Sequence, residues 1–125
     1  MATREIPRGE WPAFFDSFSK KHRGWPVNLE IMNPEIGDQT EARDLPLEGI
    51  TAELNERGSD EIEIVVGREP DRHVSHTILA PKKVWLKSSA EGADEALEIQ
   101  GENATALIRF RSSILPELVD GTLNG

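Results

Sequence analysis

The chain has 125 residues, of which 14 are Lys or Arg and 23 are Asp or Glu, and its formal net charge at pH 7 is −9. This surplus of carboxylates disfavours nucleic acids and anionic membrane surfaces as partners, because both are bound largely by Lys and Arg. The chain has no cysteine, which excludes disulfides, thiol nucleophiles and thiolate metal sites.

Nothing in the sequence predicts a membrane-bound or exported protein. No apolar run approaches the roughly 20 residues of a membrane-spanning helix. The first residues, MATREIPRGE, lack the hydrophobic centre of a signal peptide. Small exported domains also tend to need disulfides, and this chain can form none. We therefore expect a cytoplasmic protein without a membrane partner.

The first predicted element after an extended arm at residues 1–6 is an amphipathic helix at about residues 8–21. Four large aromatic residues have the offsets i, i+3, i+4 and i+7, which place them on one helical stripe: Trp11, Phe14, Phe15 and Phe18. Pro12 fits only in the first turn, where its missing N–H costs no hydrogen bond. Gly24 suits the left-handed residue that ends a helix.

From residue 26 onward the apolar spacing changes to 2, which is typical of half-buried strands. The clearest alternation is EIEIVV at residues 61–66, where Glu61 and Glu63 share the face that we expect to be solvated. Pro46 predicts an edge position or a bulge. Strands are predicted at about 27–32, 45–54, 61–66, 74–79, 84–86, 97–99 and 105–111.

These elements predict an α+β fold in which the N-terminal amphipathic helix packs on a strongly bent antiparallel β-meander of six or seven strands. A small open barrel is one form of such a sheet. No second helix is predicted that could make parallel crossovers. We expect one domain over residues 1–125, with the sheet at about 26–111 and a flexible tail at about 114–125.

Candidate metal ligands are few. His73 and His76 form an H-x-x-H pair, with Asp71 close by in the sequence. On a helix this spacing could bind zinc, but on a strand the odd offset sends the two side chains to opposite faces. We therefore predict ordinary histidines, with no catalytic residue, metal or cofactor.

Basic residues surround an aromatic residue late in the chain. Lys82 and Lys83 precede Trp85, while Arg109 and Arg111 share one side of the last predicted strand. This combination can bind single-stranded nucleic acid by stacking and charge. Lys residues can also protect an exposed sheet edge, and the negative net charge favours that interpretation.

The segment from Arg8 to Trp25 resembles the opening of an uncharacterised family of short prokaryotic proteins. The matching elements are W-x-x-F-F-x-x-F-S-x-x-H-x-G from Trp11 to Gly24, L-P-L-x-G-I at residues 45–50 and H-x-I-x-x-P at residues 76–81. The resemblance implies a shared fold and carries no known activity. Because His22 belongs to this pattern, it is a better candidate for a special role than His73.

We interpret His22 as a helix-capping residue or as part of a recognition surface, and Trp25 as a plug between helix and sheet. A short helix before a bent meander is also similar, at fold level only, to Sm-like proteins, which bind RNA as rings. The favoured function is non-catalytic binding of a protein partner or self-association. The alternatives are an Sm-like binder of single-stranded nucleic acid and a small metal-dependent enzyme.

Overall fold

The computed structural model describes residues 2–55, 59–68, 72–102 and 104–110. In chain order its elements are β1 (Ala2–Ile6), the 3-10 turn η1 (Arg8–Glu10), α1 (Trp11–His22), β2 (Pro26–Asn33), β3 (Gly37–Glu53), β4 (Glu61–Arg68), β5 (Arg72–Leu79), β6 (Lys83–Ser88), β7 (Asp94–Gln100) and β8 (Thr105–Phe110). The predicted α+β class is confirmed. The described residues contain eight strands rather than six or seven. The predicted tail lies outside them.

The eight strands form a single antiparallel sheet in the order β1-β6-β7-β8-β2-β3-β4-β5. The predicted single meander is in fact two meanders, β2 to β5 and β6 to β8, which are joined where β8 pairs with β2. The expected N-terminal arm is extended but not free, because β1 pairs with β6 along its whole length. The strands at the two ends, β1 and β5, do not pair with each other, so the sheet is open.

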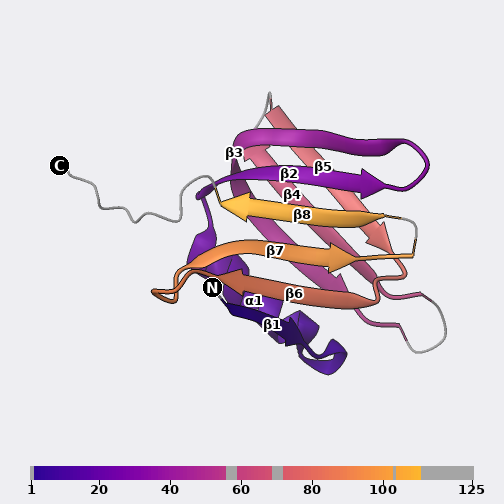
Figure 1. Cartoon of the computed structure of the whole chain (residues 1–125), viewed down its shortest axis with the longest axis horizontal. Helices are drawn as coiled ribbons and strands as arrows, with labels where there is room; N and C mark the ends of the chain where they lie inside the picture. The colour runs from indigo at the N-terminus through magenta and orange to yellow at the C-terminus, as the bar shows by residue number, and fades with distance from the viewer. Residues whose placement is uncertain (1, 56–58, 69–71, 103, 111–125) are drawn as a thin grey trace.

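The long strand β3 belongs to two layers, which cross in Figure 1. Its first half pairs with β2 and its second half with β4. Asp44 has a φ of 56°, and the pairing with β2 is irregular at this point. Such a bulge bends a strand, in agreement with the irregularity predicted near Pro46. We call β1, β6, β7, β8, β2 and the first half of β3 the front layer, and the remaining strands the back layer.

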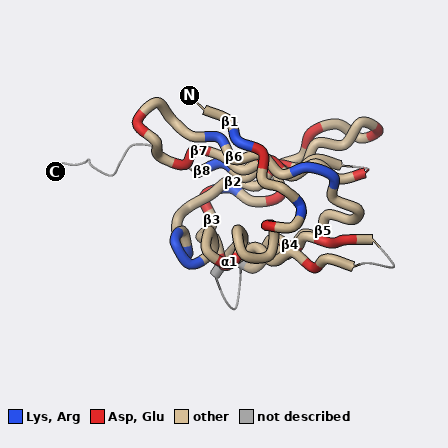
Figure 2. Tube along the Cα trace, turned by 90° about the horizontal axis from the view of Figure 1, so that it is seen from below, with Lys and Arg blue, Asp and Glu red and all other residues tan. Residues whose placement is uncertain are grey.

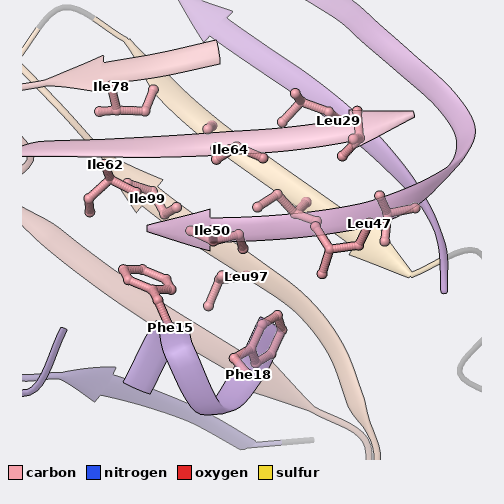
Figure 3. Close-up of a cluster of buried hydrophobic side chains, with 14 of the residues drawn as sticks. Phe15, Phe18, Leu29, Leu47, Ile50, Ile62, Ile64, Ile78, Leu97 and Ile99 are labelled. Carbon is pink, nitrogen blue, oxygen red and sulfur yellow. The ribbon is translucent and has the colours of Figure 1, made fainter. Parts of the chain in front are cut away.

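The hydrophobic core lies between the two layers, and α1 covers it at one side. Phe15 is 0% exposed and Phe18 is 4% exposed, and both side chains point from α1 toward the strand residues in Figure 3. Trp11 is also buried, and its indole N–H donates a hydrogen bond to the Ile6 carbonyl at 2.8 Å. The aromatic stripe is thus largely part of the core, as its spacing indicates, while Phe14 is half-buried.

Polar contacts fix α1 on β3. The Ser19 hydroxyl accepts a hydrogen bond from the Ile50 N–H at 2.8 Å and donates one to the Ile50 carbonyl at 3.2 Å. Beyond the helix, the Gly24 N–H donates to the Leu47 carbonyl at 2.9 Å. Gly24 has a φ of +86°, a left-handed conformation that glycine adopts without strain. These bonds fix the C-terminal end of α1.

A bidentate ion pair joins η1 to the loop before β4. The Arg8 guanidinium lies 2.6 and 2.9 Å from the two carboxylate oxygens of Asp60. The hydrogen bond from Arg8, together with one from the Asn55 N–H, lowers the pKa of Asp60 to about 2. Because this pKa is depressed, the stabilisation is present above the ordinary value and is lost as the pH falls toward 2.

We expect the Arg8→Ala variant to raise the pKa of Asp60 toward its ordinary value of 3.8. The pKa is measured from the carboxyl chemical shift of Asp60 in an NMR titration. Lys20→Ala, which removes an exposed cation on α1, serves as the control and should leave Asp60 unchanged. An Asp60 pKa that does not move in Arg8→Ala would contradict the role given to this ion pair.

Candidate functional site

The most enclosed polar group in the described structure is His22, at the last position of α1. Its side chain is 1% exposed. The ring lies 4.3 Å from the Phe18 ring, 4.7 Å from the Phe110 ring and 4.6 Å from the Trp25 ring, measured between centroids. The Trp25 ring meets it edge-on, and Trp25 is itself 44% exposed. Trp25 therefore covers this junction while keeping one side in solvent.

His22 has an acceptor at each ring nitrogen. Nδ1 lies 2.9 Å from the Phe18 carbonyl and Nε2 lies 3.1 Å from Oδ2 of Asp94. A carbonyl can only accept, so Nδ1 carries a proton and donates it. The hydrogen bond to Asp94 then needs a second proton, either on Nε2 or on the carboxyl group. Lys21 places its Nζ 3.5 Å from the same Asp94 oxygen and supplies a positive charge.

A β-bulge brings Asp94 to His22. Inside β7, Leu97 and Ile99 face the core, so strict alternation would turn Asp94 away from it. The pairing of β6 with β7 shifts by one residue between Lys87–Ala96 and Ser88–Asp94. This shift reverses the direction of Asp94, which is how bulges often re-aim side chains.

Burial and the hydrogen-bond acceptors of His22 shift its pKa in opposite directions. Burial lowers its pKa below 6.5, the Phe18 carbonyl and Asp94 partly offset this, and the Lys21 charge adds to the lowering. Enclosure by three aromatic rings leaves no path for a substrate to reach the imidazole in this conformation. The arrangement is therefore suited to holding α1, β7 and β8 together.

A second group of residues lies on the face of the front layer that points away from the core. Two apolar residues mark this face, because Leu107 and Ala96 are 7% and 8% exposed yet do not belong to the core cluster. Long side chains on neighbouring strands must therefore cover them. We call this face the Trp85 surface; it comprises Glu5, Glu30, Lys83, Trp85, Lys87, Ala96, Glu98, Leu107 and Arg109.

Strand register arranges the Trp85 surface in rows. Trp85, Glu98, Leu107 and Glu30 follow one another directly across β6, β7, β8 and β2. Lys87 and Arg109 belong to the adjacent row, with Ala96 between them. The sign of the charge thus changes from strand to strand, positive on β6 and β8 and negative on β7 and β2. Figure 2 marks the acidic and basic positions along the whole trace.

Contacts within the Trp85 surface fix several of its side chains. Nζ of Lys83 lies 5.8 Å from the centre of the Trp85 ring, within cation–π range. Nζ of Lys87 lies 3.1 Å from a carboxylate oxygen of Glu98. The pKa of Glu98 is lowered by a hydrogen bond from Gln100 and by Lys87, against the effect of burial.

The predicted recognition residues are thus only partly brought together. Trp85, Lys83 and Arg109 share the Trp85 surface. Lys82 lies in the turn before β6, where its N–H donates to the Gln100 carbonyl at 2.6 Å. His22 is buried on the opposite, core side of the front layer. Arg111 lies outside the described residues.

The H-x-x-H pair does not assemble a site. His73 is exposed and His76 is half-buried, and β5 pairs with β4 without a register shift, so the two side chains point to opposite faces. Asp71 lies outside the described residues. Among the residues that the structure describes, no group of three or more His, Asp or Glu side chains is arranged to hold a metal ion.

Comparison with known proteins places the chain in a family. The model of a family of unknown function (DUF5335) matches residues 2–117. The chain belongs to this family. An uncharacterised protein of Aquifex aeolicus (strain VF5) is 32% identical to this DUF5335 member over 119 residues, covering 94% of this chain and 100% of the relative. No solved structure matches this chain.

The family match confirms the resemblance seen in the sequence. The three links of α1 to the sheet explain several letters of the opening motif in this DUF5335 member: Ser19 bonds to Ile50, His22 contacts Asp94, and Gly24 bonds to Leu47. In the described part of the chain, no helix has both the length and the apolarity that crossing a membrane requires.

Proposed function

We propose that this chain is a single, non-catalytic cytoplasmic domain that works by binding, and that it self-associates through the Trp85 surface. The observation that carries the proposal is the charge order on that surface. Lys83 and Lys87 lie on β6, Glu98 on β7, Arg109 on β8 and Glu30 on β2. The absence of cysteine from the chain agrees with a reducing compartment.

This charge order is self-complementary. A two-fold axis parallel to the strands and between β7 and β8 would place β6 of one copy over β2 of the other. Such an axis keeps each residue in its row, so Trp85 of one copy would face Glu30 of the other. Lys83 and Lys87 would flank that Glu30 from the two neighbouring rows, and Arg109 would lie one row from Glu98. Trp85 and Leu107 supply apolar area near the centre, and a residue such as Trp is favoured at the centre of interfaces.

We expect sedimentation velocity over a range of protein concentrations to show a reversible dimer whose affinity falls with added salt. Trp85→Ala should weaken the dimer by at least about tenfold, as is common for a central aromatic contact. Ile36→Ala, which shortens an apolar side chain that is 65% exposed in the β2–β3 turn, is the control. A chain that stays monomeric at the highest concentration, or a dimer unaffected by Trp85→Ala, contradicts the proposal.

A second candidate, binding of single-stranded nucleic acid, is favoured by one observation: Lys83, Lys87 and Arg109 flank Trp85 on one face. Glu98 and Glu30 in the same rows oppose it. Titration of a fluorescent single-stranded RNA at low salt separates the two candidates. Binding that Lys83→Glu abolishes would support the second, and no binding at low salt would remove it.

A further inference from the structure

The edge strand β5 carries unpaired backbone groups. In the sheet order β5 is terminal, with β4 as its neighbour in the described structure. The Ala80 N–H donates to the Asp60 carbonyl at 3.1 Å. Residues 60 and 80 continue the β4–β5 register by one position, so they form a hydrogen-bonded pair. Since hydrogen-bonded and non-hydrogen-bonded pairs alternate, residues 74, 76 and 78 bond to β4. The N–H and C=O groups of His73, Ser75 and Thr77 therefore point outward from the sheet.

Most of the devices that usually protect such an edge are missing from β5, where Arg72 at the first position is the one Lys, Arg, Asp or Glu residue. The strand, with sequence RHVSHTIL, contains no Lys, no Pro and no acidic residue. Its pairing with β4 has no bulge. Near its C-terminal end the turn after β7 approaches it, because a Cβ at Gly101 would lie 3.1 Å from the Leu79 carbonyl oxygen. An edge of this kind is a ready template for another strand.

The outer face beside this edge is acidic, and no countercharge to its carboxylates is found among the residues that the structure describes. Glu53 and Glu61 are directly opposite each other in the register of β3 and β4, an arrangement of like charges that is unfavourable. Glu63 follows on the same face and accepts a hydrogen bond from the Ser75 hydroxyl at 2.8 Å. Among the described residues, none of these three carboxylates has an ion-pair partner.

A hollow connects the carboxylates to the free edge. Its volume is about 370 Å³, and it is lined by Thr51, Ala52, Glu53, Glu61, Glu63 and Thr77. Thr77 belongs to β5, so the hollow reaches the edge strand. A strand added to β5 would lie roughly 5 Å from it and roughly 10 Å from β4. A Lys or Arg side chain on the outer face of that strand can span this distance to the carboxylates.

We propose that β5 is a docking edge for an extended segment of a partner protein in which basic and apolar residues alternate. The outward backbone groups of His73, Ser75 and Thr77 supply the pairing, which is strand addition to an exposed edge. Basic side chains of the segment neutralise Glu61, Glu63 and Glu53. The apolar residues point to the inner side of β5, where a cleft of about 120 Å³ is lined by His76, Thr77, Ile78, Leu79 and Ala104.

The test uses the full chain and a fluorescent peptide of alternating Lys and Val, as long as β5, with binding followed by anisotropy. Ser75→Pro removes one outward N–H, which an edge strand tolerates, and is expected to weaken binding by about tenfold. Ser75→Ala is the matched control because it keeps the N–H while removing the hydroxyl, and it should change the affinity by about twofold at most.

Charge is tested with paired substitutions of equal size. Glu61→Gln combined with Glu63→Gln should weaken peptide binding by about threefold to tenfold. Glu35→Gln combined with Glu41→Gln alters the net charge equally at exposed positions away from β5 and should have a smaller effect. If the two pairs of substitutions have equal effects, the peptide is held by general attraction between opposite charges, and the proposed docking edge at β5 is overturned.

A peptide variant keeps the test valid if Ser75→Pro does not fold. N-methylation at alternate residues of the peptide removes its ability to pair with a strand, whereas its charge is unchanged. Loss of binding on N-methylation supports the docking edge. Undiminished binding of the N-methylated peptide, or no binding of the Lys-Val peptide at low salt, overturns it. Trp85→Ala should leave this binding unchanged, which distinguishes it from self-association.

Discussion

Replacing Phe15 by alanine is expected to lower the free energy of unfolding by about 3–5 kcal/mol. Phe15 is 0% exposed and lies where α1 meets both layers of the sheet. Its ring also meets the Phe14 ring edge-on at 5.4 Å, a contact that the variant loses. Since natural domains have about 5–15 kcal/mol of stability, this single change removes a large share of the total.

Urea unfolding followed by circular dichroism measures the effect of Phe15→Ala. Ser17→Ala is the control because Ser17 lies on the exposed side of the same helix, and it should change the stability by about 0.5 kcal/mol or less. A loss below about 1 kcal/mol in Phe15→Ala would show that α1 does not close the core in solution.

The second large effect is expected for Asp94→Ala, and it should depend on pH. Near pH 8, where His22 is neutral and its proton is on Nδ1, removing the carboxylate chiefly leaves Lys21 without its ion-pair partner. We expect a loss of about 1 kcal/mol or less at this pH. The loss should grow at lower pH, because Asp94 is one of the groups that favour the protonated imidazole.

The direction of the pH effect follows from the pKa of His22, which burial lowers below 6.5 in the folded protein. Below pH 6.5 the unfolded chain therefore binds more protons at this residue than the folded chain does. The stability due to His22 is present above pH 6.5 and is lost as the pH falls through the folded-state pKa. Without Asp94 that pKa falls further, so the variant loses more stability than the natural chain as the pH is lowered. The charge-assisted hydrogen bond to the protonated ring is also lost, which costs about 1–3 kcal/mol at low pH.

Unfolding experiments between pH 5 and pH 8 measure this difference between Asp94→Ala and the natural chain. Asp16→Ala is the matched control, since Asp16 is 68% exposed and forms an ion pair with Lys20 at 3.3 Å. Its effect should be small and should not vary with pH in this range. His22→Phe keeps an aromatic ring without a titrating group. An unchanged pH dependence of stability in His22→Phe would refute the assignment to His22.

Much of the fold could be predicted because its signals are local. The aromatic stripe of α1 and the alternating residues of β4 both indicate which face is buried. A buried face repeats about every 3.6 residues in a helix and every 2 in a strand, so the spacing predicts the element. The position of Pro12 in the first turn and the left-handed Gly24 follow from backbone constraints on single residues. None of these features depends on distant parts of the chain.

The partners of the strands were harder to predict. The pairing of β1 with β6 joins residues such as Ile6 and Val84, which are far apart in sequence, and nothing in the short segment ATREI indicates it. The bridge between β8 and β2 joins the two meanders in the same non-local way. Pattern arguments identify strands, whereas their order depends on how the whole core is closed.

The contact between His22 and Asp94 could not be predicted from the sequence. His22 was singled out because it belongs to the opening motif. Asp94 is one of many acidic residues, and the alternation around Leu97 and Ile99 assigns it to the wrong face. Only the bulge, which is a property of the pairing with β6, turns it toward His22. Bulges of this kind have no strong signal in a single sequence.

The unbroken course of β3 through both layers limits where the chain can change in length. The 17 residues of β3 pair with β2 in one register and with β4 in another. An inserted residue shifts one of these registers, and a shift by one turns every following side chain to the opposite face. Insertions and deletions among DUF5335 relatives should therefore gather in the turns on either side of β3, where no second partner is displaced.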